Sequence, residues 1–241
     1  MSSLANAPAI EVRDVSKRFR IYREKPTSLK QRLLTSRSRA EDFWALRDVA
    51  LDVGEGSTFG LIGHNGSGKT TLLKCVAGIL RPTSGAILQR GRLAALLELG
   101  AGFHPELTGR ENVYLNASFL GLSRKQTDAA FDDIVAFAEL EQFIDTEVKF
   151  YSSGMLVRLG FAVAVHVEPD VLLIDEVLAV GDEAFQAKCL NRVREFQREG
   201  RTIVLVTHAL DTVTEICDRA AMLHHGELHA IGMPAEVVRE M

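Results

Sequence analysis

Cysteine is scarce in this sequence: among 241 residues there are three, Cys75, Cys189 and Cys217, and they lie far apart. Disulfide frameworks and zinc sites both need cysteines in close or regular groups, and this spacing fits neither. We therefore expect structural thiols in a reducing compartment.

Long apolar runs are also missing. A segment that crosses a bilayer takes roughly 20 apolar residues, and the best stretch, 156–174, is broken by Arg158, His166, Glu168, Pro169 and Asp170. The opening residues, MSSLANAPAI, have neither the basic start nor the apolar centre of a signal peptide. The sequence therefore predicts a cytoplasmic chain.

An excess of positive charge is absent, since the formal net charge is -4. This argues against binding of nucleic acid by bulk charge. Basic residues are nevertheless concentrated between positions 13 and 39, where ten lysines and arginines occur. Two interpretations remain open for this stretch, a solvated face and a surface near anionic headgroups.

Short apolar strands alternate with helical segments, which is typical of an α/β fold. The stretches 57–62, 171–175 and 202–208 read as buried parallel strands. Residues 110–167 have helical periodicity, with runs at 111–122 and 127–140, and predict a helical unit inserted between strands. The polar stretch 21–44 predicts an insertion with a short amphipathic helix. Further strands are expected at 10–19, 46–53 and 86–99, a hairpin at 220–232, and helices at 72–80, 185–200 and 234–241.

The octapeptide GHNGSGKT at 63–70 matches the phosphate-binding loop in full, and it stands between a predicted strand and a predicted helix. Its glycines let successive N–H groups turn toward phosphate oxygens. Lys69 supplies positive charge to the β- and γ-phosphates, and Thr70 offers a hydroxyl to Mg²⁺. The nucleotide-binding residues expected here are Gly63, His64, Asn65, Gly66, Ser67, Gly68, Lys69, Thr70 and Thr71.

Two other predicted strands end in polar side chains. Asp175 closes VLLID at the edge of the sheet where ligands of α/β folds bind, and is the expected holder of Mg²⁺. Glu176 is the candidate general base that polarises the attacking water. His208 ends TIVLVTH and can donate to the γ-phosphate. A solubilising acid and a structural histidine are the plainer alternatives, but the complete phosphate loop favours Lys69, Glu176 and His208 as catalytic residues.

The order of GHNGSGKT, YSSGM (151–155), VLLIDE, VGD and VTH resembles the nucleotide-binding subunit of ATP-binding cassette (ABC) transporters over nearly the whole chain. This resemblance implies a P-loop NTPase of the ABC-ATPase type, with a RecA-like core, an N-terminal antiparallel β subdomain and an inserted α-helical subdomain. One domain over 1–241 is then expected, with its core in 1–108 and 168–241, a helical subdomain at 109–167 and a basic insertion at 20–43. ATP and Mg²⁺ are the implied ligands.

In that family the segment before the signature helix is usually Leu-Ser-Gly-Gly-Gln, so YSSGM matches at Ser152 and Gly154 and departs at Tyr151, Ser153 and Met155. The surrounding strings, including GAGFHPELTGRENVYLNASFLGLS and FQAKC, resemble the ATPases that export lipid-linked polysaccharides such as O-antigen, teichoic acid and mycobacterial galactan. The resemblance implies an ATP-sandwich homodimer, a membrane permease and a lipid-linked polysaccharide as partners. It also implies a peripheral place on the cytoplasmic face of the inner membrane.

The resemblance also assigns the second half of the site. Ser152, Ser153 and Gly154 would complete the ATP site of a second copy, and Asp182 falls where the family has an aspartate that contacts the opposite subunit. The basic insertion would lie near the lipid headgroup or the permease, or else it is a decorated loop.

Two assignments keep alternatives. Phe19 is the expected adenine-stacking aromatic, with Tyr22 as a near alternative and Trp44 as a third, and each can instead be a core aromatic. Glu98 is the candidate for the family's glutamine beside Mg²⁺, although a count back from PELT lands nearer Leu99.

The competing function is a soluble ABC ATPase that acts as a switch on the ribosome or DNA. Such proteins carry two cassettes in one chain or a long coiled-coil insertion, and neither pattern is found in this sequence. Some polysaccharide exporters continue into a C-terminal carbohydrate-binding domain, which we do not expect here.

Overall fold

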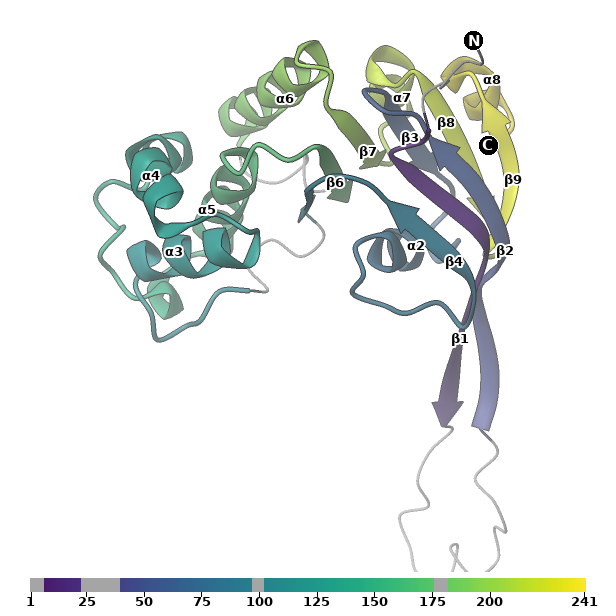
Figure 1. The fold of residues 1–241 in the computed structure, drawn as a ribbon, viewed down its shortest axis with the longest axis horizontal. Coiled ribbons are helices and arrows are strands. Elements are labelled where there is room, and N and C mark those ends of the chain that lie inside the picture. The colour runs from purple at the N-terminus through teal and green to yellow at the C-terminus, as the bar shows by residue number, and fades with distance from the viewer. Residues whose placement is uncertain (1–6, 23–39, 97–101, 176–181) are drawn as a thin grey trace, which may run out of the picture.

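The computed structural model describes residues 7–22, 40–96, 102–175 and 182–241. The expected roles of Glu98 and Glu176, and the helix expected within 23–39, lie outside the described residues. Two sheets and a block of helices make up the described chain (Figure 1).

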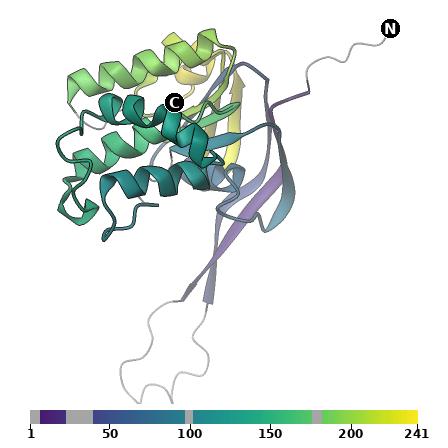
Figure 2. The same ribbon diagram turned by 60° about the vertical axis from the view of Figure 1, so that its left-hand side comes forward.

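The first sheet is antiparallel, and it contains β1 (Ile10–Tyr22), β2 (Ala40–Val53) and β4 (Ser84–Gln89) in the order β2-β1-β4. The strands β1 and β2 pair from Ile10 opposite Val53 to Tyr22 opposite Ala40, and their far ends project from the body as an arm (Figure 2). Both strands run further than predicted, so 20–22 and 40–43 belong to the hairpin and not to the insertion. Cross-strand pairing explains this, since Arg18 Nη1 lies 2.9 Å from Asp42 Oδ2.

The second sheet has six strands in the order β5-β6-β7-β3-β8-β9. Neighbours from β5 to β8 are parallel, and β9 is antiparallel to β8. The strands are β3 (Thr58–Ile62), β5 (Leu93–Leu96), β6 (Val171–Asp175), β7 (Thr202–Val206), β8 (Arg219–His224) and β9 (Glu227–Gly232). The expected hairpin at 220–232 is confirmed by the antiparallel pairing of β8 with β9, from Ala220 opposite Gly232 to His224 opposite Glu227. His225 and Gly226 both have positive φ, as a tight two-residue turn requires.

Side chains alternate between the two faces of this sheet, so each face has its own core. On one face, Phe59 and Leu61 pack with α2 (Lys69–Val76) against the antiparallel sheet. On the other face, Leu172 and Ile203 pack against α5 (Ser153–Val165), α6 (Glu183–Arg198), α7 (Leu210–Ile216) and α8 (Pro234–Arg239).

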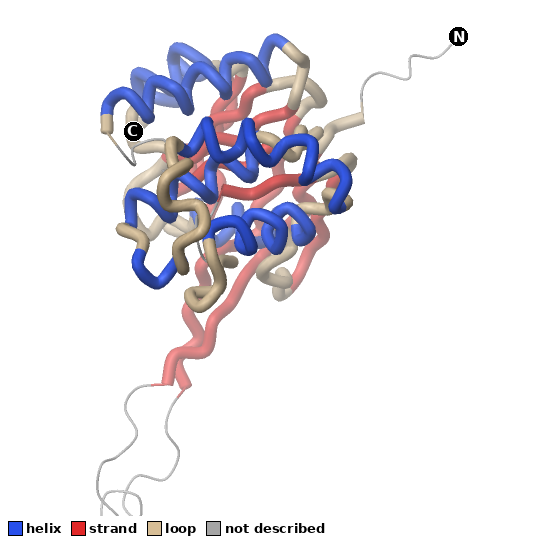
Figure 3. The backbone as a smooth tube through the Cα atoms, turned by 90° about the vertical axis from the view of Figure 1, so that its left-hand side faces the viewer, coloured by secondary structure: helices blue, strands red, loops and turns tan. Residues whose placement is uncertain are grey.

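The helical block lies at the side of the sheet and contains α3 (Gly109–Phe119), α4 (Arg124–Ala138), the short 3₁₀ helix η1 (Val148–Phe150) and α5 (Figure 3). Its core includes Val113, Ile134 and Leu159, all fully buried. The helical runs expected at 111–122 and 127–140 are confirmed, but α3 and α4 start two and three residues earlier than the runs. Capping boxes at Thr108 and Ser123 set these starts.

Across the described ranges, the structure contains no helix with the length and hydrophobicity needed to cross a membrane. Cys75, Cys189 and Cys217 are all buried, as expected of structural thiols.

Candidate nucleotide site

The loop between β3 and α2 has a backbone that only glycine accommodates at two points. Gly63 and Gly68 have φ values of +140° and +106°. A Cβ atom at Gly63 would lie 2.3 Å from the carbonyl oxygen of Leu223, and one at Gly68 would lie 2.6 Å from that of Ala45. The expected phosphate-binding loop is therefore formed, with the close backbone approach that its chemistry needs.

Lys69 is the first residue of α2, and its side chain is folded back over the loop. Only 5% of the residue is exposed, and Nζ donates hydrogen bonds to the carbonyl oxygens of Gly63, at 2.7 Å, and His64, at 3.0 Å. The cation is thus held where the N-terminal N–H groups of α2 also favour an anion. This arrangement suits the phosphates of a nucleotide.

The turn between β8 and β9 contacts the phosphate loop and supports it, and this contact is called the brace below. Gly226, in the β8–β9 turn, donates its N–H to Ser67 O at 2.9 Å and accepts from the N–H of Arg47 at 2.8 Å. A Cβ atom at Gly226 would lie 2.7 Å from Ala45 O, so this contact depends on glycine as well. Sequence reasoning missed this brace, and only its HG turn signal pointed to Gly226.

A hollow of about 220 Å³ lies beside the loop, and one of its walls is an aromatic side chain that was not predicted. Phe43 of β2 lines this hollow, together with Ala45 and residues of the loop. Phe43 is 49% exposed and is paired directly with Phe19 of β1. A half-exposed aromatic ring beside a phosphate loop can stack on a base.

The predicted adenine-stacking residues lie elsewhere. Phe19 does not line the hollow, and its ring has Lys17 Nζ 5.2 Å from its centroid. Trp44 follows Phe43 and so faces the opposite side of the hairpin, where Arg18 lies 5.5 Å from its ring. The side chain of Tyr22 is outside the described part of the chain. Phe43 could not be predicted from the sequence, because the segment between β1 and β2 is long and their pairing register cannot be read from it.

The predicted strand-end residues meet at one edge of the parallel sheet. Val206 of β7 is paired with Leu61 of β3 on one side and with Asp175 of β6 on the other. The phosphate loop, Asp175 and the residues after Val206 therefore leave the sheet at the same level. His208 lies two residues beyond β7 and is exposed. This is the carboxyl edge, where ligands of open α/β sheets bind.

The oxygen donors at this edge fit Mg²⁺. The Thr70 residue is exposed at the start of α2, and Asp175 is partly exposed at the end of β6. A hydroxyl and a carboxylate are hard ligands of the kind that this ion takes when it also binds phosphates.

The predicted signature residues do not reach this hollow within one chain. Ser152 caps α5, where its Oγ accepts a hydrogen bond of 3.2 Å from the N–H of Met155. Ser152 and Ser153 are exposed, and a Cβ atom at Gly154 would find only Ser152 Oγ, at 3.8 Å, within 4 Å. None of these residues lines the hollow beside the loop. The start of α5 is thus an exposed helix terminus that lies outside the hollow beside its own phosphate loop.

Tyr151, which departs from the family pattern, has a structural role. Its ring is buried and its hydroxyl donates to the carbonyl oxygen of Phe143 at 2.7 Å. A Cβ atom at Gly109 would lie 2.2 Å from that hydroxyl oxygen. Tyr151 therefore anchors the start of α5 to the segment that follows α4 and to the start of α3.

Asp182 caps α6, since its Oδ1 accepts from the N–H of Phe185 at 2.9 Å. Its Oδ2 forms an ion pair with Arg158 of α5. The backbone hydrogen bond from Phe185, with a smaller contribution from Arg158, lowers the pKa of this carboxyl below its ordinary value. Asp182 is therefore ionised and held in place inside its own chain, and its contact with an opposite subunit stays a prediction.

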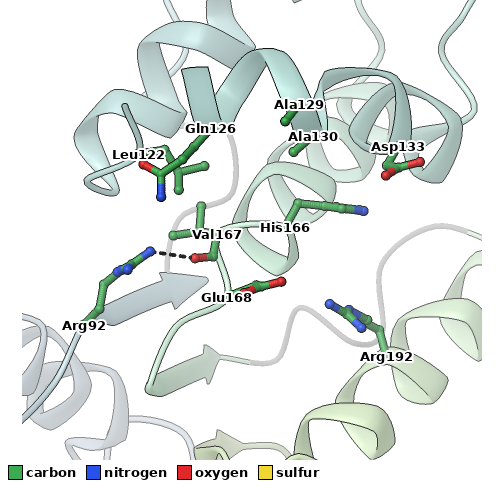
Figure 4. Close-up of a pocket in the computed structure, with 10 residues that line it drawn as sticks. All are labelled: Arg92, Leu122, Gln126, Ala129, Ala130, Asp133, His166, Val167, Glu168 and Arg192. Carbon is green, nitrogen blue, oxygen red and sulfur yellow. Dashed lines mark hydrogen bonds between the residues drawn. The ribbon is translucent and has the colours of Figure 1, made fainter. Parts of the chain in front are cut away.

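A larger hollow, of about 370 Å³, lies at the other end of the sheet (Figure 4). Arg92, which precedes β5, and Glu168, which precedes β6, line it together with Arg192 of α6. His166 lies at this hollow, and burial lowers the pKa of its imidazole. Its described lining offers side chains of both charges and no glycine-rich backbone, so the phosphate loop remains the candidate nucleotide site.

Comparisons with known proteins agree with this geometry. Residues 46–179 match the family described as ABC transporter. The O-antigen export system ATP-binding protein RfbB of Klebsiella pneumoniae is 44% identical over 236 residues, which cover 96% of each chain. The teichoic acids export ATP-binding protein TagH of Levilactobacillus brevis is 44% identical over 234 residues, covering 97% of this chain and 64% of that protein.

The fold also has a solved counterpart. The dimeric structure of a post-hydrolysis state of the ATP-binding cassette MJ0796, bound to ADP and Pi, superposes with a TM-score of 0.74. It is 22% identical and covers 93% of this chain and 98% of that chain, which shows the shared fold. The family match, the close relatives and the phosphate loop confirm the resemblance seen in the sequence: this chain belongs to the ABC transporter family, as an ATP-binding cassette of that family.

Proposed function

We propose that this ABC-type ATPase powers the export of a lipid-linked polysaccharide, of the O-antigen or teichoic acid type, across the cytoplasmic membrane. The phosphate loop at the carboxyl edge of the sheet is the observation that supports ATP as the fuel. The polysaccharide is supported by the names of the relatives, which are 44% identical over nearly the whole of this chain. Galactan, which the sequence also suggested, stays a prediction.

In this proposal the loop binds the phosphates of ATP and Phe43 stacks on its base. Thr70 and Asp175 would hold Mg²⁺, and the bound ion would offset charge on the phosphates. Lys69 contributes charge from the other side, and His208 donates to the γ-phosphate. Glu176 follows Asp175 in sequence and acts as general base toward the attacking water.

A second copy of the chain completes each site. The exposed start of α5 has free space in front of Gly154 and no contact with the hollow of its own chain. Ser152, Ser153 and Gly154 of one copy therefore bind the γ-phosphate held by the other, and two ATP molecules lie at a two-fold interface. Hydrolysis removes the bridging anion, and the interface opens.

A membrane permease converts this closing and opening into transport. The chain would then work at the cytoplasmic face of the membrane as a peripheral subunit, with residues 109–167 as the helical subdomain and the remainder as the core. The basic stretch within 23–39 would touch the permease or the lipid-linked substrate. The length of the relatives varies, since the matched region is 96% of RfbB and 64% of TagH.

Reconstitution tests the proposal. The full chain and its co-purified permease are placed in vesicles, and ATPase activity is followed while lipid-linked O-antigen or teichoic acid precursors are added. The proposal predicts stimulation by one precursor class, and no hydrolysis above background with Glu176→Gln. Co-purification with ribosomes or DNA and no membrane protein would favour the soluble-switch alternative.

A further inference from the structure

Arg158 occupies the junction of three helices, where α4, α5 and α6 lie side by side (Figure 1). It lies one turn after Gly154 on α5, so it shares a face with the exposed start of that helix. Only 20% of its side chain is exposed, and its guanidinium carbon lies 5.0 Å from the ring centroid of Phe185 on α6. A guanidinium held this way has a fixed direction.

The two terminal nitrogens of Arg158 go to two different carboxylates. Nη2 pairs with Asp182 Oδ2, at the start of α6, and Nη1 lies 2.9 Å from Glu139 Oε2, at the end of α4. Asp182 uses its other oxygen to cap α6. The start of α6 is therefore fastened directly to α5.

Lys188 extends the same network. Its Nζ lies 3.3 Å from Glu139 Oε1 and donates to the carbonyl oxygen of Phe137 at 2.8 Å. Charges alternate along the series of contacts Lys188, Glu139, Arg158 and Asp182. The two inner residues each contact two groups of opposite charge, and the two outer ones each contact one such group and a helix end. The network joins the helical block to α6, the next helix after the strand β6 that ends at Asp175.

We propose that Arg158 is a positioning residue that couples the two ATP sites of the dimer. The inference rests on the proposed function, in which the start of α5 serves the ATP of the second copy. Asp182 follows Glu176 by six residues, and Glu176 serves the ATP of its own copy. The ion pair between Arg158 and Asp182 holds the start of α6 to α5, so engagement of one site promotes hydrolysis at the other.

A double-mutant cycle tests the coupling in the full chain. Asp182→Asn removes the charge but keeps a good helix cap, and Arg158→Met keeps the apolar stem. We expect each variant to lower kcat about tenfold and to reduce the Hill coefficient for ATP from about 2 toward 1. The double variant should lose no more than the single variants, because both changes break the same link. Affinity for a fluorescent ATP analogue, measured with dilute protein, should stay within about twofold of the unmutated value.

Arg192→Met is the matched control. Arg192 lies on α6 with 22% of its side chain exposed, pairs with Glu195 at 2.8 Å and lies 4.4 Å from the ring of Phe196, but it has no contact with Asp182. We expect it to retain both kcat and the Hill coefficient. Arg158→Lys keeps the positive charge but cannot bind both carboxylates through two separate nitrogens. We expect it to show more cooperativity than Arg158→Met and less than the unmutated chain.

The outcomes separate the two claims. If Arg158→Met behaves like Arg192→Met, or if the double variant shows the product of two independent losses, Arg158 does not couple the sites. Thermal melting identifies any variant that fails to fold, in which case Arg158→Lys and Asp182→Asn carry the cycle. Absence of ATPase activity in the unmutated chain contradicts the proposed function itself, and the inference falls with it.

Discussion

Phe19 and Phe43 are direct cross-strand partners in the β1–β2 hairpin, and Phe43 is the one that lines the hollow beside the phosphate loop. Partners in an antiparallel pair point to the same face. The two rings lie at the same level of the arm, so it is the strand that carries each ring that decides which one lies beside the loop. The structure favours Phe43, the residue that the sequence did not single out.

Phe43→Ala should weaken nucleotide binding. Loss of one base-aromatic stack is worth about 1–3 kcal/mol, or about a 5- to 150-fold loss of affinity. Phe19→Ala is the matched control and should change affinity by less than about twofold, since Phe19 does not line the hollow. Titration with a fluorescent ATP analogue measures both. A larger loss of affinity with Phe19→Ala than with Phe43→Ala would show that Phe19 stacks on the base, as the sequence first predicted.

Gly68→Ala should destabilise the chain far more than Gly66→Ala. At Gly68 a Cβ atom would lie 2.6 Å from Ala45 O, with φ at +106°, whereas at Gly66 no atom lies within 4 Å. We expect a loss of about 3 kcal/mol or more for Gly68→Ala and about 1–2 kcal/mol for Gly66→Ala, whose backbone is strained without a clash. Urea unfolding of the nucleotide-free chain gives both values. Equal losses would mean that the Ala45 carbonyl group of β2 shifts to make room for the added carbon.

Tyr151→Phe should cost about 1 kcal/mol of folding free energy, because it leaves the carbonyl oxygen of Phe143 without its hydroxyl donor. The change keeps the ring that fills the buried site. Thermal unfolding measures the loss, and ATP-dependent association of the variant shows whether the start of α5 has shifted. An unchanged melting temperature would show that the hydrogen bond contributes nothing to the anchor.

Stability should fall in alkali because of two buried thiols. Burial raises the pKa of Cys189 and of Cys217 from 9.0 to about 12. Between these values the unfolded chain loses the thiol proton before the folded chain does. The stability that the protonated thiols give the folded chain is therefore fully present below pH 9 and is lost as pH rises toward 12. At pH 10 the free energy of unfolding has fallen by about 1 kcal/mol per thiol.

Cys189→Ala isolates this effect, since alanine does not titrate. Its free energy of unfolding, measured in urea at pH 7.5 and pH 10, should decline with pH by about 1 kcal/mol less than that of the unmutated chain. An identical decline in both proteins would show that Cys189 ionises as readily in the folded state as in the unfolded one.

The parts of the fold that could be predicted from sequence are those with short-range signals. The spacing of its glycines predicts the phosphate loop, and a continuous apolar run predicts the strand that ends at Asp175. The length of the β1–β2 arm could not be predicted, because its pairing connects residues on either side of a long intervening segment. Tyr151 was noted as a departure from a pattern, but its buried anchor to Phe143 depends on tertiary packing.

The same limit applies to Asp182 and Arg158. A resemblance predicted a role for Asp182 across a subunit interface, whereas its cap on α6 and its ion pair with α5 depend on how the helices pack. Arg158 carried no signal other than its interruption of an apolar run.

In the proposed dimer, ATP joins two copies of this chain through the phosphate loop of one and the start of α5 of the other. The most direct measurement is the mass of the full-length Glu176→Gln variant in solution, by light scattering, with ATP and Mg²⁺ or with ADP. We expect a dimer of twice the 26.5 kDa chain with ATP and a monomer with ADP, and the same monomer when Gly154→Trp blocks the start of α5. A Glu176→Gln chain that is saturated with ATP and remains monomeric would contradict it.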